Sequence, residues 1–352
     1  MWTLGVAHVK AGKSIACWVA RAAAIAAAFV SATSSAEDSA PAPAASAPSS
    51  LNWELAVKTL GGRQFWGDVQ FFQGWRIQQN VFSHHYRLLD ESDHRHASGT
   101  LADCQQKLAE IRTEQKLPPM QGKAVILIHG ILRSSKCMYA LSKALRAEGY
   151  TVVPFDYPST QVSVPESAEY LHRVISSLEG IEHIDLVVHS MGGLVVRSYL
   201  STHNDPRLHR LTMLGVPNYG AEMADMLKRN VLFRTIMGPA GQQLISHPEG
   251  LIAALPIPQL EFAVIAGARG TADGWNPLIP GDDDGTVTVA STRLAGAADF
   301  IAVPALHTFM LANPAVVQAS VRFLTTGRLR SEGPCEPIPV APVIADEPPP
   351  SP

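Results

Sequence analysis

Residues 185–193 read Asp-Leu-Val-Val-His-Ser-Met-Gly-Gly, and the rest of the chain is best interpreted around this stretch. The β-branched run that enters it is typical of a buried strand, and the apolar residues that follow it have the spacing of a helix face. A serine in a sharp turn between strand and helix exposes its hydroxyl above the sheet edge, close to the helix N-terminus. The pattern indicates Ser190 as a nucleophile, with an ordinary strand-to-helix turn as the alternative.

The composition favours a folded protein. The chain has 352 residues, of which 46% are hydrophobic and 17% are charged. A chain of this size can bury one large core or two modest ones. Its formal net charge of −3 gives no reason to expect a nucleic-acid partner.

The N-terminus has the pattern of a secretory signal peptide. Lys10, Lys13 and Arg21 accompany an apolar run at 22–30 that is too short to span a bilayer. Small residues then offer a cleavage site, so we predict a signal peptide over residues 1–36. The mature chain would be periplasmic or secreted, and an uncleaved N-terminal anchor is the alternative.

Export would place three cysteines of the mature chain, Cys104, Cys137 and Cys335, in an oxidising compartment. An odd number of cysteines cannot all pair within one chain. A disulfide between Cys104 and Cys335 is one candidate, and the sequence alone does not decide the connectivity.

The segments after the signal peptide differ in composition. Residues 37–50 are mostly Ala, Pro and Ser and are expected to form a disordered linker. Alternating aromatic and polar residues over 51–89 predict two or three antiparallel strands. A helix that begins at Thr100 and ends before Pro118 completes the N-terminal part, 51–122, which we expect at the edge of the sheet.

Residues 123–327 alternate between strand-like and helix-like runs, which is typical of a mostly parallel sheet with helices on both faces. The segment 221–258 breaks this alternation, and two or three short helices are expected there. It is a candidate lid, with an inserted structural subdomain as the alternative. The Pro-rich residues 328–352 are expected to form a disordered tail.

Two groups of residues invite a metal-site interpretation. The first is a set of four histidines in the segment 83–98: His84, His85, His94 and His96. They lack the helical spacing and cysteine partners of zinc sites, so a solvated loop is predicted. The second is the acidic run 282–284, a weak signal for Ca²⁺. We predict neither a metal nor a cofactor.

A serine nucleophile needs a base, and the base needs a group that orients it. An acid after a later strand and a histidine after the last strand give the chain order Ser…Asp…His. Parallel strands end at one sheet edge, so residues just past them converge. We predict His307 as the base and Asp284 as the acid, because a glycine-assisted turn follows Asp284; Asp283 is the fallback.

A tetrahedral intermediate also needs hydrogen-bond donors for its oxyanion. The N–H of Met191, directly after the nucleophile, is one candidate. The N–H of Ile131 is the other, because it lies in the loop after the strand 124–128, where Gly130 allows a turn. His129 is then expected to orient this loop rather than to act as a second base.

These motifs together resemble the α/β-hydrolase superfamily. They are His129-Gly130, Val-His-Ser-Met-Gly-Gly at 188–193, Gly-Val-Pro-Asn-Tyr-Gly at 215–220, Asp-Gly-Thr-Val at 284–287, and His307. Within it they are most similar to bacterial triacylglycerol lipases and esterases of the His-Gly-X oxyanion type. The resemblance covers about residues 124–324. It implies an α/β-hydrolase fold, ester hydrolysis through an acyl-enzyme, no cofactor, and a lid region before the acid.

One residue departs from the family pattern, because Val188 stands where these families usually have glycine. The predicted function is an exported serine esterase or lipase that acts on an ester or lipid substrate, with transient contact to a lipid surface or the cell envelope. The same site could serve an acyltransferase, a thioesterase or a glycolipid deacylase. A non-catalytic binding protein of the same fold is the remaining alternative.

Overall fold

The structure is a computed structural model. It describes residues 57–58, 63–221, 224, 231–245 and 247–340. The chain divides into two units, 1–53 and 54–352, and all described residues belong to the second. The predicted signal peptide and the predicted linker therefore lie outside the described residues.

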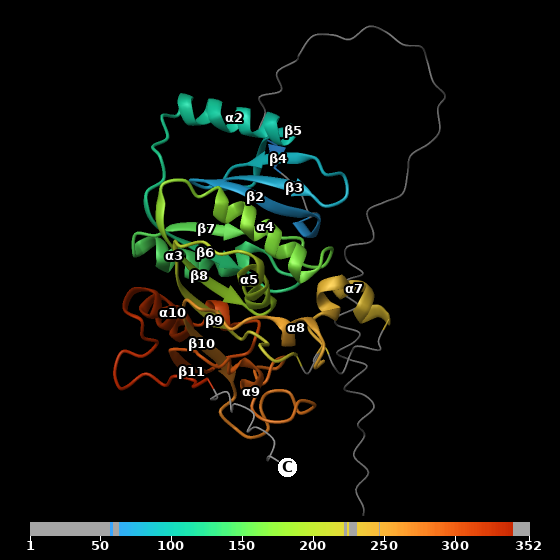
Figure 1. The fold of residues 1–352 in the computed structure, drawn as a ribbon, viewed down its shortest axis with the longest axis vertical. Helices are drawn as coiled ribbons and strands as arrows, with labels where there is room; N and C mark the ends of the chain where they lie inside the picture. Colours follow the sequence, from blue (N-terminus) through green and yellow to red (C-terminus); the bar gives the residue numbers. More distant parts are fainter. Residues whose placement is uncertain (1–56, 59–62, 222–223, 225–230, 246, 341–352) are drawn as a thin grey trace, which may run out of the picture. The chain divides into compact units, whose positions relative to one another are not determined.

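A six-stranded parallel sheet runs through the centre of the described unit, in the order β11-β10-β9-β8-β6-β7 (Figure 1). The strands are β6 (Gly122–Ile128), β7 (Thr151–Phe155), β8 (Ile181–His189), β9 (Leu208–Leu214), β10 (Glu261–Ala268) and β11 (Asp299–Pro304). Their apolar sequences are those expected of strands that are buried on both faces.

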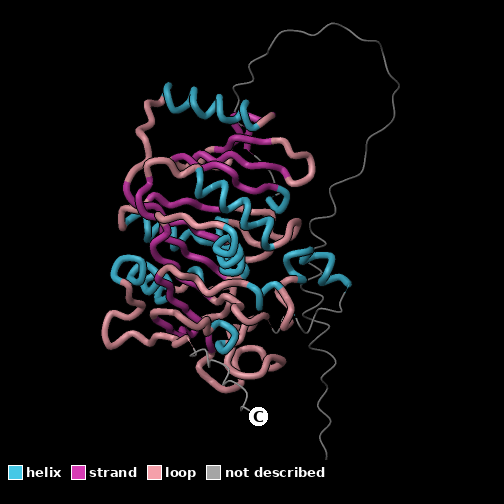
Figure 2. Tube along the Cα trace, in the orientation of Figure 1, coloured by secondary structure: helices cyan, strands magenta, loops and turns pink. Residues whose placement is uncertain are grey.

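Helices cover both faces of this sheet (Figure 2). Alternate side chains of β6 enter two different apolar clusters, Ile126 and Ile128 in one and Val125 and Leu127 in the other. The first cluster includes α4 and α5, and the second includes α3 and α10. These helices are α3 (Tyr139–Ala147), α4 (Val164–Ser176), α5 (Met191–Thr202) and α10 (Pro314–Thr326).

The N-terminal strands form a separate antiparallel sheet in the order β1-β5-β4-β3-β2. They are β1 (Val57–Lys58), β2 (Trp66–Phe72), β3 (Trp75–Asn80), β4 (Tyr86–Leu89) and β5 (His94–Gly99). Helix α2 (Leu101–Glu114) packs on this sheet and begins with a reciprocal capping box between Thr100 and Asp103. On its other side, β2 packs against α4, and a Cβ at Gly67 would lie 2.5 Å from the Tyr170 ring.

The solvated loop predicted over 83–98 is wrong, because β4 and β5 occupy most of this segment. The backbone of β5 pairs with β4 and β1, so the strand forms although its side chains are mostly polar and remain partly exposed. Two of the histidines, His94 and His96, lie 3.4 and 2.9 Å from the carboxylate of Asp90.

The two sheets meet at Asp68 of β2 and Asp156, the residue after β7. Asp68 N–H donates to Asp156 O at 2.8 Å, and Asp156 N–H donates to Asp68 Oδ2 at 2.7 Å. Arg76 of β3 donates to Asp156 Oδ2 at 2.8 Å and also pairs with Asp93. The N-terminal sheet is thus attached to the β7 edge of the parallel sheet through buried charges.

The insertion after β9 contains two described helices. They are α7 (Val231–Gln242), which is kinked at Gly238 and Pro239, and α8 (Leu251–Ala254). Ala240 and Ile252 of these helices and the nearby Leu244 are buried in the same apolar cluster as α5. Other parts of the insertion lie outside the described residues.

The predicted disordered tail needs correction over residues 328–340. Leu329 is buried, and its N–H donates to the Asp299 carboxylate at 2.9 Å. Arg330 Nη1 donates to the same carboxylate at 2.6 Å, and Ile338 exchanges backbone hydrogen bonds with Gly296 and Ala297. The prolines prevent regular secondary structure in this segment. The segment still packs on the core, because its N–H groups satisfy the buried carboxylate of Asp299. Residues 341–352 lie outside the described part.

The three described cysteines, Cys104, Cys137 and Cys335, are free thiols, so the candidate disulfide between Cys104 and Cys335 is not formed. Burial raises the pKa of the Cys104 thiol to about 11. Among the described residues, no helix has both the length and the apolar character to cross a membrane.

A parallel sheet with helices on both faces, a strand–turn–helix at β8 and α5 near its middle, and a helical insertion after the next strand make up the α/β-hydrolase fold. Val188 fits this arrangement, because its side chain is fully buried in the apolar cluster beneath α4 and α5. The valine is part of the core at this point of the strand.

Candidate active site

Ser190 lies in the turn between β8 and α5. Its backbone has φ +54° and ψ −129°, a conformation that non-glycine residues rarely adopt and that is often found at functional sites. Its N–H donates to Leu214 O at 3.0 Å. A Cβ at Gly192 would lie 2.7 Å from Ile128 O, so the sharp turn requires glycine at that position.

His307 and Asp284 lie in direct contact. His307 Nδ1–H donates to Asp284 Oδ2 at 2.7 Å, and His307 N–H donates to Asp284 O at 2.8 Å. The other carboxylate oxygen accepts from the N–H groups of Thr286 and Val287 at 3.0 and 2.8 Å. The buried carboxylate thus fixes the histidine tautomer and leaves the lone pair on Nε2.

His189 connects the serine turn to the His307 loop, a contact that we did not predict from the sequence. It is buried, its Nε2–H donates to His307 O at 3.0 Å, and the two rings lie 4.6 Å apart. Burial, together with the neighbouring His307, holds the pKa of His189 well below its ordinary value. A neutral His189 therefore helps to position the loop of His307.

The other two acids of the run 282–284 have different partners. Asp283 accepts from the N–H groups of Asn276 and Gly285, at 3.1 and 2.6 Å. Asp282 accepts from Arg269 N–H at 2.8 Å. Both carboxylates hold the surrounding loop. Within the described ranges, no three His, Cys, Asp or Glu side chains gather into a group that could hold a metal ion.

The loop after β6 lies against the serine. A Cβ at Gly130 would lie 2.9 Å from Ser190 Cβ, so only glycine lets the loop approach this closely. Leu132 N–H donates to Ser159 Oγ at 3.2 Å, whereas Ile131 N–H has no acceptor among the described residues. The structure places Ile131 in the loop beside Ser190, and Met191 at the first position of α5.

Ser190 Oγ and His307 Nε2 form no hydrogen bond with each other or with another described residue. Catalytic hydrogen bonds are often long in the free enzyme and shorten only when the substrate is bound. Of the predicted residues, the structure brings Asp284 and His307 into direct contact. It also brings His307 into contact with His189, the residue before Ser190.

His129 is a structural residue of the loop after β6. Its Nδ1 lies 2.7 Å from Gly130 O, and its ring stacks on Tyr157 with 4.5 Å between centroids. Burial lowers the pKa of His129, although the nearby Asp156 opposes this effect. These contacts hold the ring inside the protein.

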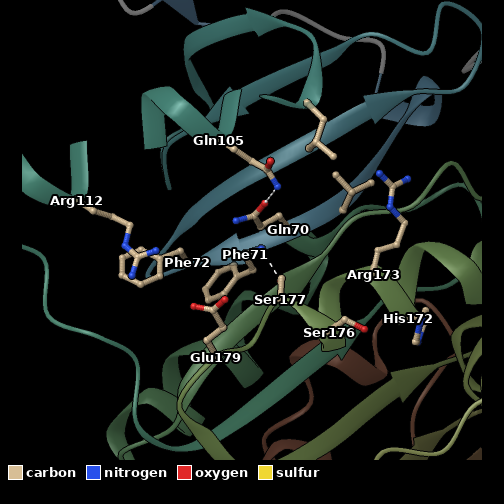
Figure 3. Close-up of a pocket in the computed structure, with 12 residues that line it drawn as sticks. Gln70, Phe71, Phe72, Gln105, Arg112, His172, Arg173, Ser176, Ser177 and Glu179 are labelled. Atoms are coloured by element: carbon tan, nitrogen blue, oxygen red, sulfur yellow. Dashed lines mark hydrogen bonds between the residues drawn. The ribbon is translucent and has the colours of Figure 1, made fainter. Parts of the chain in front are cut away.

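A cavity of about 410 Å³ lies apart from these residues, between β2, α2 and α4 (Figure 3). Gln105 donates to Gln70 Oε1 at 2.9 Å at its edge, and Phe71 N–H donates to Ser177 Oγ at 3.0 Å (Figure 3). None of the predicted site residues lines this cavity, so it is not part of the candidate active site.

Sequence comparison gives a partial likeness. A family model described as "Domain of unknown function (DUF7379)" matches residues 94–256, which is less than half of the chain. No curated protein sequence matches the chain.

Several solved structures are similar over part of the chain. The lin2722 gene product of Listeria innocua is 19% identical, with a TM-score of 0.43, over 58% of this chain and 95% of that one. The mature form of the lipase BlEst2 from Bacillus licheniformis is 19% identical, with a TM-score of 0.43, over 59% of this chain and 92% of that one. Phospholipase PlaB from Legionella pneumophila is 17% identical, with a TM-score of 0.41, over 48% of this chain and 45% of that one. Because these identities and TM-scores are low, the fold is assigned from the strand order of this chain itself.

Proposed function

We propose that this chain is a serine hydrolase that cleaves carboxylic esters through an acyl-enzyme. Ser190 would be the nucleophile, His307 the general base and Asp284 the group that orients it. The observation that carries this proposal is the 2.7 Å hydrogen bond between His307 Nδ1 and Asp284 Oδ2. It supports a base with its Nε2 lone pair free, on a loop that His189 ties to the serine turn.

The reaction would proceed in two acyl transfers. Ser190 Oγ attacks the ester carbonyl while His307 Nε2 accepts its proton, and the oxyanion accepts hydrogen bonds from the N–H groups of Ile131 and Met191. The C–O bond to the alcohol then breaks, and His307 returns the proton to the leaving oxygen. Water repeats the sequence on the acyl-enzyme, which releases the acid and restores Ser190.

Labelling with a fluorophosphonate tests this proposal directly. We expect the probe to modify Ser190, and we expect the mature chain to release p-nitrophenol from p-nitrophenyl esters. Ser190→Ala should abolish labelling and reduce kcat by about 10⁵–10⁶. If wild type and Ser190→Ala were equally inert toward the probe and a broad ester panel, the non-catalytic alternative would replace the proposal.

An apolar acyl chain is the substrate feature that we favour. Large apolar side chains are exposed on the loops of Ile131 and His307, with Leu132 at 49%, Leu306 at 37% and Phe309 at 65%; Tyr219, at 55%, is exposed on the loop after β9, whose Gly215 lies beside His307. Exposed apolar groups beside a site fit a lipid ester or a lipid surface. We expect kcat/KM to rise from acetyl to octanoyl esters, and a flat profile would oppose a lipidic substrate. Alcohols, amines and thioesters offered to the same preparation would separate acyl transfer and thioester cleavage from ester hydrolysis.

We also propose that the protein is exported. The support is the sequence of residues 1–36, which lies outside the described part of the chain. N-terminal sequencing of the protein recovered from cell fractions checks this proposal. Recovery from the cytoplasm with an intact N-terminus would contradict it.

A further inference from the structure

The loop after β6, residues 129–134, is called the oxyanion loop here, and the segment after β7 holds its backbone. Tyr157 Oη–H donates to His129 O at 2.7 Å, and Leu132 N–H donates to Ser159 Oγ at 3.2 Å. Leu132 has φ +58°, a strained conformation for a residue with a side chain, which persists only where surrounding contacts hold it. The contact from Ser159 is therefore a restraint on the loop.

Gln64 bonds both the oxyanion loop and Ser159. It precedes β2 of the N-terminal sheet, and its Nε2–H donates to Arg133 O at 3.1 Å. Its Oε1 accepts from Ser159 Oγ at 2.9 Å and from Thr160 Oγ1 at 3.3 Å. One side-chain amide thus bonds the oxyanion loop directly and also orients the hydroxyl that holds Leu132.

Buried charges attach the far end of the oxyanion loop to the same sheet. Ser135 N–H and Oγ–H donate to the Asp156 carboxylate at 2.6 and 3.0 Å. Arg76 of β3 donates to that carboxylate at 2.8 Å, and Asp68 of β2 pairs with the Asp156 backbone. The N-terminal part of the chain therefore bonds the oxyanion loop directly through Gln64, and Asp156 links Arg76 to Ser135, the residue that follows the loop.

We propose that Gln64 is a positioning residue, through which the N-terminal sheet keeps the N–H of Ile131 directed at the reacting carbonyl. This inference rests on the function proposed above. Ile131 directly precedes Leu132, so when Leu132 leaves its left-handed conformation the Ile131 N–H turns as well. An oxyanion donor acts only when it is held in place before the charge develops.

The test compares Gln64→Met with Gln70→Met. Methionine has nearly the length of glutamine but removes all three hydrogen bonds of the Gln64 amide. Gln70 lies in β2, shortly after Gln64 in the chain, and bonds Gln105 at the surface, away from the oxyanion loop, so it controls for the loss of a glutamine amide. We expect Gln64→Met to lower kcat and the fluorophosphonate labelling rate about tenfold, because small displacements of positioned groups cost up to about a hundredfold.

A role in stability alone would lower the Tm of Gln64→Met but leave kcat per folded molecule as in wild type. We expect KM and the pH dependence of kcat to stay as in wild type, although the Tm of Gln64→Met should fall below that of Gln70→Met, because its three lost bonds are partly buried and the one of Gln70 is exposed. Ser159→Ala should also lower kcat, and the double variant should lose little more than Gln64→Met alone, because Gln64 acts on Leu132 through Ser159 and on Arg133 directly. Additive losses, or wild-type rates in Gln64→Met, would overturn the inference.

The two proposals fail in different ways. An inert wild-type protein would overturn the proposed function and this inference with it. An active wild type whose Gln64→Met and Gln70→Met variants are equally active would overturn only the role of Gln64. Should Gln64→Met be unstable, Gln64→Glu tests the direct bond to the loop by itself, because it keeps the acceptor for Ser159 Oγ–H but cannot donate to Arg133 O, and a wild-type kcat in this variant would overturn the role of that bond.

Discussion

Asp283 and Asp284 are adjacent in the chain, yet their carboxylates have different partners. Asp284 accepts from His307 Nδ1, whereas Asp283 accepts from two loop N–H groups. We expect Asp284→Asn to lower kcat about 10³–10⁴-fold, because an amide favours the wrong histidine tautomer. Asp283→Asn keeps one acceptor oxygen, so kcat should stay within about tenfold of wild type. Ester hydrolysis at saturating substrate measures both, and the reverse order would make Asp283 the orienting acid.

The residues of the candidate site differ in how far a sequence can indicate them. Ser190, Asp284 and His307 follow strands in an order that only a few folds combine, so the chain order predicts their convergence. Gln64 and Ser159 leave no such signal. Each makes single hydrogen bonds to positions far away in the chain, and neither spacing nor composition reports a contact of that kind.

At the scale of elements, the C-terminal segment gives a stability prediction. The buried carboxylate of Asp299 accepts from Leu329 N–H, Glu336 N–H and Arg330 Nη1 at 2.9, 2.9 and 2.6 Å. Burial alone would raise the pKa of Asp299, but these donors outweigh it and lower the pKa. A chain that ends at Gly327 loses these three donors and the buried Leu329, so we expect its free energy of unfolding to fall by about 3 kcal/mol or more.

Urea denaturation with a matched truncation checks this prediction. A chain that ends at Val340 keeps all the contacts of Asp299 and loses only residues outside the described part. We expect it to unfold at the same urea concentration as the full chain. Equal stability of the two truncated chains would show that the segment only lies on the surface.

The sequence indicates elements well where apolar periodicity is strong. The strands and helices of residues 123–327 follow their predicted order because their side chains are buried. The prediction fails for β5 and for residues 328–340. Backbone pairing with β1 and β4 stabilises the first, and donors to one carboxylate stabilise the second. Both interactions are tertiary, so the local sequence carries little trace of them.

At the scale of the whole molecule, two sheets are joined through buried charges rather than through an apolar contact alone. Asp68 and Asp156 share Arg76, at 3.6 and 2.8 Å from its Nη1. Burial raises the pKa of Asp68 to about 6, although Arg76 opposes it. For Asp156, the contacts with Arg76, His129 and Ser135 outweigh burial and hold the pKa below its ordinary value.

These opposite shifts make the junction sensitive to pH in a defined direction. Folded Asp68 keeps its proton up to about pH 6, whereas the unfolded carboxyl loses it near 3.8. Between these values the folded state binds more protons, so the contribution of Asp68 to stability falls as the pH rises. The contribution of Asp156 has the opposite sign, since it is present above the unfolded pKa and is lost as the pH falls through the lower folded value.

Asp68→Asn removes the first effect and leaves the second. As the pH rises from roughly 4.5 to 7, we therefore expect wild type to lose about 1 kcal/mol or more of unfolding free energy relative to Asp68→Asn. Urea denaturation across this range measures the difference, in which the other titrating groups cancel. Asp103→Asn is the control, because hydrogen bonds from Thr100 lower the pKa of the exposed Asp103, which moves its titration away from this range. Parallel stability curves for wild type and Asp68→Asn would mean that Asp68 is charged throughout, and that Arg76 stabilises both carboxylates of the junction.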